Sequence, residues 1–173
     1  FQNNLSAFDI GPGNCLIDEW VRKNSNKKFD KNGELAKAGR VDQLILNHAI
    51  DNFKINSYNQ SLDIKNFDIS FARGLSLEDG CATLTEFTGY LIAEGLKFIS
   101  QKNNITFLLC GGGRKNINLI DCIKTYLLNE NNITLEVIDN YNLKGDYIES
   151  QAFAFLAIRS FLDLPISFST TTG

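Results

Sequence analysis

One short stretch of the sequence has the residue types and spacing that phosphate chemistry needs. It contains Asp9, a Gly-Pro-Gly turn at residues 11–13, and Asn14. The pattern predicts a strand over Leu5–Ile10, an N-cap at Asn14 and a helix from Cys15. Glycines let backbone N–H groups approach an anion, and the helix dipole favours negative charge there. The carboxylate could then accept a proton from a nucleophile or hold its metal. An ordinary strand–turn–helix corner with a satisfied Asp explains the same residues.

A second glycine turn lies at residues 111–113, after a β-rich run and before Arg114, Lys115 and Asn116. Three consecutive glycines cost conformational entropy, so they are expected where a flat ligand or a phosphate lies against bare backbone. A tight turn that needed only one glycine is the alternative. Two such corners favour a nucleotide site, and both are expected at the same edge of a parallel sheet. A dinucleotide fold is not favoured, because no GxGxxG occurs.

The elements that must position these corners follow from hydrophobic periodicity. A helix is predicted over 15–24, and a second over 41–53 that buries an apolar set (Leu44, Ile45, Ala49, Ile50 and Phe53). Ser76 is expected to cap a long core helix from Leu77 through Ile99, whose small residues Thr88 and Gly95 allow a neighbour to approach closely. Residues 54–75 show no sustained period and predict an irregular excursion.

The carboxyl-terminal half alternates strands and helices. Strands are predicted over 105–110 and 133–138, and their lack of polar alternation indicates cover on both faces. Helices are predicted over 117–128 and 146–162, and the second is apolar almost all round, so it is expected to be enclosed. The alternation indicates α/β layers with parallel pairing in at least part of a mixed sheet flanked by helices.

Other titratable residues have structural explanations. Asp18 and Glu19 share the polar face of the first predicted helix and are expected to be solvated. His48, the only histidine, lies at the border of an apolar face and is expected to be structural. The four cysteines (Cys15, Cys81, Cys110 and Cys122) form no CxxC pair and are typical of small reduced hydrophobes rather than of a disulfide or a metal site.

Length and charge limit the function classes. The chain has 173 residues, 43% of them hydrophobic, which is enough for one domain with a substantial core. Its net charge of -3 gives no basic surface for nucleic acid. No apolar run approaches the roughly 20 residues of a membrane span, and no basic n-region with an apolar h-region occurs. The reduced cysteines lead us to expect a cytoplasmic protein. The sequence begins with Phe1 and contains no Met, so we expect a segment to precede it.

Several blocks, in this order, resemble the carboxyl-terminal half of the anhydro-N-acetylmuramic acid kinases. The resemblance runs from Leu5 to Gly173, and its blocks are FDIGPGN with LIDEW, NGELAKAGRVD, LSLEDGCATLTEFTGYLIAEGL, LLCGGGRKN, and IESQAFAFLAIR with LPISFSTTTG. It implies a ribonuclease H-like domain of the actin/hexokinase superfamily over residues 1–173. It also implies a bacterial kinase of peptidoglycan recycling that uses ATP and Mg²⁺. Such an enzyme opens 1,6-anhydro-N-acetylmuramic acid with water while phosphorylating its 6-position.

The resemblance also implies roles for individual residues. Asp9 would be the base that activates the attacking water. Phosphate and sugar would be bound by Gly11, Gly13 and Asn14, and nucleotide by Gly111, Gly112, Gly113, Arg114 and Asn116. Glu149 would face the cleft, although a first-turn Glu that stabilises a helix dipole is an equal alternative. The partners would be ATP and the sugar, with neither nucleic acid nor membrane; a homodimer is one arrangement that the sequence leaves open.

Three departures from the family pattern accompany the resemblance. Ile10 stands where the family usually has Thr, and residues 57–61 replace a proline-rich segment that ends Lys-Ser. The amino-terminal half, with its GTSxDG-type phosphate loop, does not occur in this sequence. The chain alone is therefore expected to be inactive, because phosphoryl transfer depends on positioning and charge stabilisation from both sides. A non-catalytic remnant or binding module with weak affinity for nucleotide or sugar is the alternative.

Overall fold

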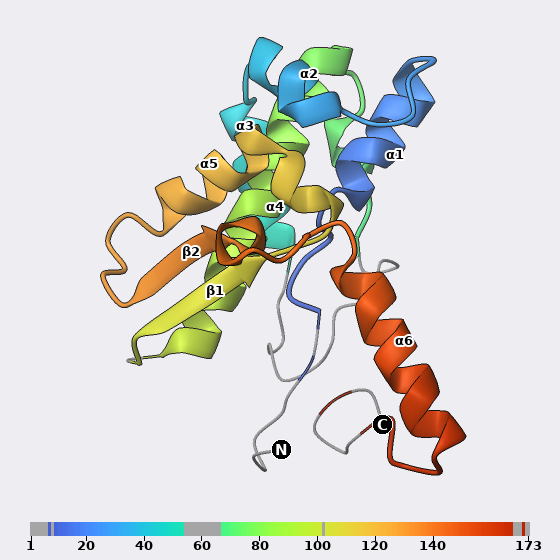
Figure 1. Cartoon of the computed structure of the whole chain (residues 1–173). Helices are drawn as coiled ribbons and strands as arrows, with labels where there is room; N and C mark the ends of the chain where they lie inside the picture. Colours follow the sequence, from blue (N-terminus) through green and yellow to red (C-terminus); the bar gives the residue numbers. More distant parts are fainter. Residues whose placement is uncertain (1–6, 8, 54–66, 102, 168–170, 172–173) are drawn as a thin grey trace.

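The computed structural model describes residues 7, 9–53, 67–101, 103–167 and 171, and shows helices packed around one long helix beside a small parallel sheet (Figure 1). The α-helices and strands are α1 (Cys15–Asn24), α2 (Glu34–Ala38), α3 (Gln43–Asn52), α4 (Leu77–Ser100), β1 (Ile105–Leu109), α5 (Ile117–Tyr126), β2 (Ile133–Val137) and α6 (Ile148–Phe161). Short 3₁₀ turns are η1 (Lys31–Gly33), η3 (Ser70–Ala72), η4 (Gly112–Lys115) and η5 (Ile138–Tyr141). The predicted α/β class is confirmed.

Helix α4 is the element on which the others are assembled. Ser76 caps it as predicted, since its hydroxyl accepts a hydrogen bond from the Asp79 N–H at 3.0 Å. Helices α1, α2, α3 and α5 all contact α4. Small residues permit close packing: an added Cβ at Gly80 would overlap the Trp20 ring, and one at Gly95 would lie 2.7 Å from the Cβ of Ile10. The predicted close approach at Gly95 is thus confirmed, and Ile10 is the neighbour.

The two ends of α4 belong to two hydrophobic cores. Its amino-terminal half packs against α1, α2 and α3, and the buried residues of α1 are Leu16, Ile17, Trp20 and Val21. Its carboxyl-terminal half packs with α5, both strands and Ile10. A single helix therefore connects the region around α1 to the sheet.

The sheet consists of β1 and β2, which pair in parallel with Ile105 opposite Ile133 and Leu109 opposite Val137. Parallel pairing was predicted, because α5 lies between the two strands in sequence. Cover on both faces was also predicted, and that prediction is wrong for β1. Phe107 packs against the α4–α5 core, whereas Leu108, on the opposite face, is 43% exposed. Helices of the described chain cover one face of this strand only.

The second predicted helix forms as α3, but part of its buried face was misassigned. Helix α2 ends at Ala38, and α3 begins at Gln43, two residues later than predicted, with Asp42 as its N-cap. Leu44 was expected to be buried but is 81% exposed, whereas Leu46 is 1% exposed. The Asp42 N–H donates to the Thr83 hydroxyl of α4 at 3.0 Å. This bond helps set the rotation of α3 about its axis, so that Leu46 rather than Leu44 faces the core.

Helix α6 forms as predicted but is not enclosed. None of its residues is buried, and Phe161 is 87% exposed. Figure 1 shows the chain leaving the α4–α5 layers before α6, so the helix extends away from them. The expectation of enclosure failed because periodicity reports how apolar a helix is and not which elements come near it.

The remaining predictions fall partly outside the described residues. Of the predicted strand at 5–10, the structure describes Ala7, Asp9 and Ile10, and none of these is in a strand. Of the predicted excursion at 54–75, residues 67–75 are described and contain one 3₁₀ turn; residues 57–61 lie outside the description. Within the described part of the chain, no helix has the length and apolarity needed to cross a membrane.

Candidate active site

The first corner, Gly11 to Asn14, leads directly into α1. The Cys15 N–H donates to the Pro12 carbonyl at 3.1 Å, and Gly13 has a φ of +56°, which favours glycine. An added Cβ at Gly11 would lie 3.0 Å from an Ile92 carbon, so the turn is seated closely on α4. Asp9 is exposed just before this turn. Main chain thus forms most of the corner, with one carboxylate beside it.

The second corner begins where β1 ends. Gly111 has a φ of +72°, and residues 112–115 form η4 before α5 starts. Among the described residues, and apart from each glycine's chain neighbours, no atom lies within 4 Å of an added Cβ at Gly111 or Gly112, and at Gly113 only the side-chain nitrogen of Asn14 does, at 4.0 Å. The backbone of this turn therefore has open space beside it, as a turn that receives a ligand requires.

A pair of side-chain amides joins the two corners. Asn116 donates from Nδ2 to the Oδ1 of Asn14 at 3.1 Å, and its own Oδ1 accepts from the Leu119 N–H at 3.1 Å. Asn116 is 4% exposed, so both bonds lie within the protein. The two corners therefore meet, as predicted, but none of the described residues before the first corner lies in a strand of the sheet, as that prediction required. The role of Asn14 differs from the prediction: it precedes α1, but its side chain makes no capping bond, because Asn116 engages its oxygen.

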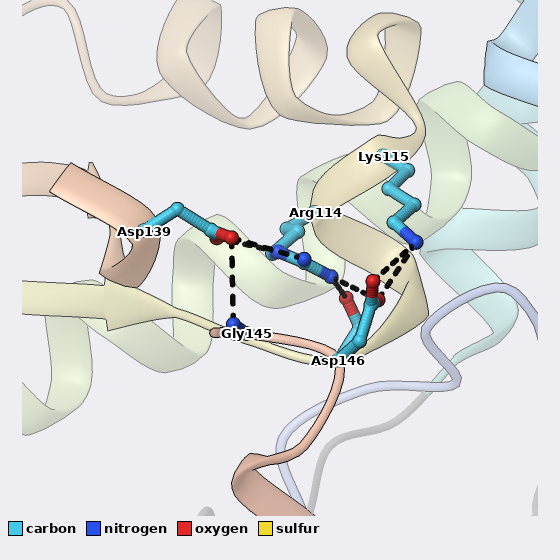
Figure 2. Close-up of polar contacts among 6 residues, drawn as sticks. Arg114, Lys115, Asp139, Gly145 and Asp146 are labelled. Atoms are coloured by element: carbon cyan, nitrogen blue, oxygen red, sulfur yellow. Dashed lines mark hydrogen bonds and ion pairs between the residues drawn. The ribbon is translucent and has the colours of Figure 1, made fainter. Parts of the chain in front are cut away.

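Arg114 forms the other polar centre of the site, and Figure 2 shows its guanidinium between Asp139 and Asp146. Its Nε and Nη2 donate to Asp139 at 2.7 and 3.2 Å, and its Nη1 donates to Asp146 at 2.7 Å and to the Gly111 carbonyl at 2.8 Å. Lys115 donates to Asp146 at 2.8 Å. Two cations and two carboxylates therefore share one network.

The pKa values in this network follow the ion pairs. Hydrogen bonds from Arg114 and Lys115 lower the pKa of Asp146 to about 2. The hydrogen bond from Arg114 also lowers the pKa of Asp139, and the two carboxylates raise the pKa of Arg114. Asp139, Asp146 and Arg114 are therefore charged at neutral pH, and the two carboxylates neutralise the guanidinium from two sides.

Comparison with known proteins gives the family. The model of the anhydro-N-acetylmuramic acid kinases matches residues 2–173. This chain belongs to that family. An anhydro-N-acetylmuramic acid kinase of Pelagibacter ubique (strain HTCC1062) is 50% identical over 176 residues, covering 98% of this chain and 46% of that protein. Those of Zymomonas mobilis and Rhizorhabdus wittichii are 34% and 38% identical, each over 99% of this chain and 46% of the relative.

The chain spans about half the length of the curated relatives it matches. The resemblance inferred from the sequence blocks is confirmed as family membership.

Glu149 lies apart from the contacts that join the two corners. It is exposed in the first turn of α6, where an acidic residue stabilises the helix dipole. Asp146, three residues earlier, belongs to the Arg114 network. That Glu149 faces the cleft and that it stabilises the helix dipole therefore both stay predictions. The start of α6 is linked to the glycine turn through the bond between Asp146 and Arg114.

Sequence reasoning missed three residues of this site: Asp139, Gly145 and Asp146. An added Cβ at Gly145 would overlap the Arg114 guanidinium, so only glycine fits there. Asp139 comes two residues after β2, at the carboxyl end of a strand parallel to β1. Because the carboxyl ends of parallel strands share one edge, that position was a usable signal for Asp139. The other two residues carry no comparable signal.

The remaining titratable candidates do not assemble into a metal centre. No group of three or more His, Cys, Asp or Glu that could hold a metal ion occurs among the described residues. His48 is exposed and contacts Asn52 of its own helix, and its structural role stays a prediction. All four cysteines are free; Cys81 and Cys122 are buried as predicted, whereas Cys15 and Cys110 are exposed. Burial raises the pKa of Cys81 to about 12.

Proposed function

We propose that this chain is the carboxyl-terminal, ribonuclease H-like domain of an ATP-dependent kinase of 1,6-anhydro-N-acetylmuramic acid, acting in the cytoplasm on cell-wall recycling products. The observation that carries the proposal is the joining of two glycine corners by Asn14 and Asn116 in a chain of this family. One corner carries an exposed carboxylate and the other an open backbone. An acid beside a phosphate-receiving turn is the arrangement that phosphoryl transfer with general-base assistance needs.

In the proposed reaction, Asp9 takes a proton from water as the water oxygen bonds to C1 of the sugar. The C1–O6 bond breaks, O6 bonds to the γ-phosphorus of ATP, and the bond to the β-phosphate oxygen breaks. The products are N-acetylmuramic acid 6-phosphate and ADP. Asp9 thus acts at the atom where the ring opens, and the turns at Gly11–Asn14 and Gly111–Gly113 orient the phosphates through backbone N–H groups.

Mg²⁺ bound to ATP would neutralise phosphate charge in this reaction. Proteins usually hold Mg²⁺ with one or two carboxylates together with substrate phosphates. We assign the exposed Asp9 carboxylate to proton transfer, and we assign no Mg²⁺ ligand among the described residues. Asn116 would act by fixing the position of Asn14 rather than by reaching the nucleotide, since its amide group is already bonded to Asn14 and Leu119.

The test uses a full-length protein that carries this chain, incubated with MgATP and 1,6-anhydro-N-acetylmuramic acid. We expect stoichiometric formation of ADP and the sugar 6-phosphate, measured by mass spectrometry. In ¹⁸O-labelled water, the label should appear at C1 and not in the phosphate, because water attacks carbon. Binding of nucleotide or sugar without turnover would contradict the kinase and favour the binding module.

A further inference from the structure

Arg114 follows three glycines, a position from which a cation would be expected to reach a phosphate, yet its side chain turns into the protein. The Arg114 side chain is 7% exposed, and its guanidinium makes four hydrogen bonds to Asp139, Asp146 and the Gly111 carbonyl. A guanidinium has five N–H donors in a fixed fork, so this set uses most of its capacity. Figure 2 shows the fork held between the two carboxylates.

The backbone of Gly111 is held on both sides by this arrangement. Its N–H donates to the Gly145 carbonyl at 3.0 Å, and its carbonyl accepts from Arg114 at 2.8 Å. Gly145 in turn donates its N–H to Asp139 at 3.4 Å and leaves no space for a side chain beside Arg114. The first residue of the turn is therefore fixed, including its left-handed φ of +72°.

The next two residues of the turn face open space. In the part of the chain that the structure describes, no atom beyond the chain neighbours lies within 4 Å of an added Cβ at Gly112, and at Gly113 only the Asn14 amide nitrogen does. The turn is thus anchored through Gly111 and open at Gly112 and Gly113. An anchored, open backbone is a preorganised surface for an anion, because its N–H groups need no reorganisation when the ligand binds.

We propose that Asp139 and Asp146 are positioning residues of the nucleotide site: they hold Arg114, and Arg114 holds the glycine turn in the shape that receives the phosphates of ATP. The inference rests on the proposed function. It replaces the expectation that Arg114 contacts the nucleotide, since two carboxylates already neutralise this cation. The phosphates would meet the backbone N–H groups of the turn. Because Asp146 precedes Glu149 by three residues, the same contacts fix the start of α6.

The first test measures the shape of the turn without any ligand. Asp139→Asn is nearly isosteric and weakens the bidentate pair with Arg114, whereas Lys115→Gln removes only the exposed partner of Asp146. In the 173-residue chain, we expect hydrogen exchange of residues 111–114 to accelerate by about 10-fold or more in Asp139→Asn. Lys115→Gln should exchange like the wild type. Unchanged exchange in Asp139→Asn would overturn the inference.

The second test measures ATP use in a full-length protein that carries this chain. We expect Asp139→Asn and Arg114→Lys to weaken MgATP binding and to raise the KM for ATP by roughly 10- to 100-fold, because a displaced turn no longer meets the phosphates. The KM for the sugar should change much less, and kcat at saturating ATP should stay within a few-fold. Merely lower stability would not produce this division between the two substrates.

The same variants separate positioning from direct contact. If Arg114 bound the phosphates itself, Asp139→Asn would free the guanidinium, and the affinity for ATP would be unchanged or higher; that result overturns the inference. If Asp139→Asn does not fold, Asp146→Asn removes the charge from one of the four Arg114 bonds, together with the Lys115 pair, and should show the same effect at smaller amplitude. A wild-type protein that binds MgATP without phosphorylating the sugar overturns the proposed function alone, because the variants' ATP affinities still test the inference. A wild-type protein that binds no MgATP overturns both.

Discussion

Asn116 shows how one side chain can join two parts of a site. Its oxygen caps α5, and its nitrogen holds Asn14 from the first corner, 102 residues away in sequence. A buried amide that satisfies both groups is stabilising, whereas a lost partner leaves a buried polar group that costs about 1–3 kcal/mol. Asp9 and Gly112, the residues that would meet substrates, lie at the exposed or open parts of the same two corners.

Asp9→Asn tests the proposed base in the full-length enzyme. The change is nearly isosteric and removes the negative charge and the proton acceptor, so kcat should fall on the order of 10²–10⁴-fold. The KM for the sugar should change much less, because the other binding contacts remain. Steady-state kinetics and thermal unfolding on one preparation check this. Asp51→Asn, at an exposed position on α3, is the matched control and should leave kcat unchanged. A lower Tm with kcat within a few-fold would assign Asp9 a structural role.

Gly112→Val tests whether the second turn forms the bare floor of the nucleotide site. Unlike Gly111, Gly112 does not have a positive φ, and no atom of the described residues beyond its chain neighbours would contact its added Cβ. The variant should therefore fold normally, while its side chain occupies ligand space and weakens ATP binding by at least about 10-fold, or 1.4 kcal/mol. Calorimetry with MgATP and circular dichroism measure the two effects. Gly112→Ala should show a smaller loss, and equal affinities in all three proteins would indicate an ordinary turn.

Among the elements, α4 contributes residues to both cores and contacts four other helices. Its amino terminus is anchored by Ser76, while the far half supports Ile10 and the sheet. The positions of the two corners therefore depend on a single rigid helix. The Arg114 network adds a second connection, from the end of β1 to the start of α6.

Ser76→Ala should lower the free energy of unfolding by about 1 kcal/mol, because the Asp79 N–H loses its capping acceptor. Urea unfolding followed by circular dichroism measures this change. Ser160→Ala, at an exposed position within α6, removes a hydroxyl without removing a cap and should stay within about 0.5 kcal/mol of the wild type. Equal losses in the two variants would show that the cap is not what stabilises α4.

The Arg114 network should make stability depend on pH in the acid range. The pKa of Asp146 is about 2 in the folded protein against an ordinary 3.8, and that of Asp139 is also lowered. A folded-state pKa below the unfolded value stabilises the protein at higher pH, and this contribution is lost as pH falls from about 4 to about 2. Urea midpoints at pH 5, 4, 3 and 2 should fall less steeply in the double variant Asp139→Asn/Asp146→Asn than in the wild type. Parallel curves would contradict this assignment.

At the scale of the whole molecule, large apolar side chains remain exposed on α6 and on the outer face of β1. Helix α6 has no buried residue, and Leu108 on the outer face of β1 is 43% exposed. The matched family members are about twice as long as this chain. The residues around both corners in this structure all belong to this chain, which is about half as long as those relatives.

The 173-residue chain by itself should show no kinase turnover. Phosphoryl transfer depends on positioning and charge stabilisation from all sides of the phosphate, and we propose that another segment supplies one side. An assay of ADP formation with MgATP and 1,6-anhydro-N-acetylmuramic acid measures this, with a full-length protein as the positive control. Multiple turnovers by the 173-residue chain would mean that its own residues contain the complete phosphate site.

Local signals in the sequence were sufficient for most of the secondary structure and for the family. The helix at Cys15–Asn24, the Ser76 cap and the parallel pair β1–β2 were predictable, because caps, periodicity and strand–helix alternation depend on near neighbours in the chain. The two glycine corners were also recognisable, because a glycine turn that leads into a helix is a short-range pattern.

Only the tertiary structure decided which way side chains turn and what covers each face. In the tertiary structure, Arg114 bonds to Asp139 and Asp146 and does not point outward. Asn14 bonds to Asn116 and does not cap its own helix. The packing of α3 buries Leu46, and α6 remains exposed. These outcomes depend on partners distant in sequence, whose positions are set by packing on α4 and by hydrogen bonds between loops. Periodicity and composition contain no information about such partners, so the sequence could identify the corners of the site but not the network that holds them.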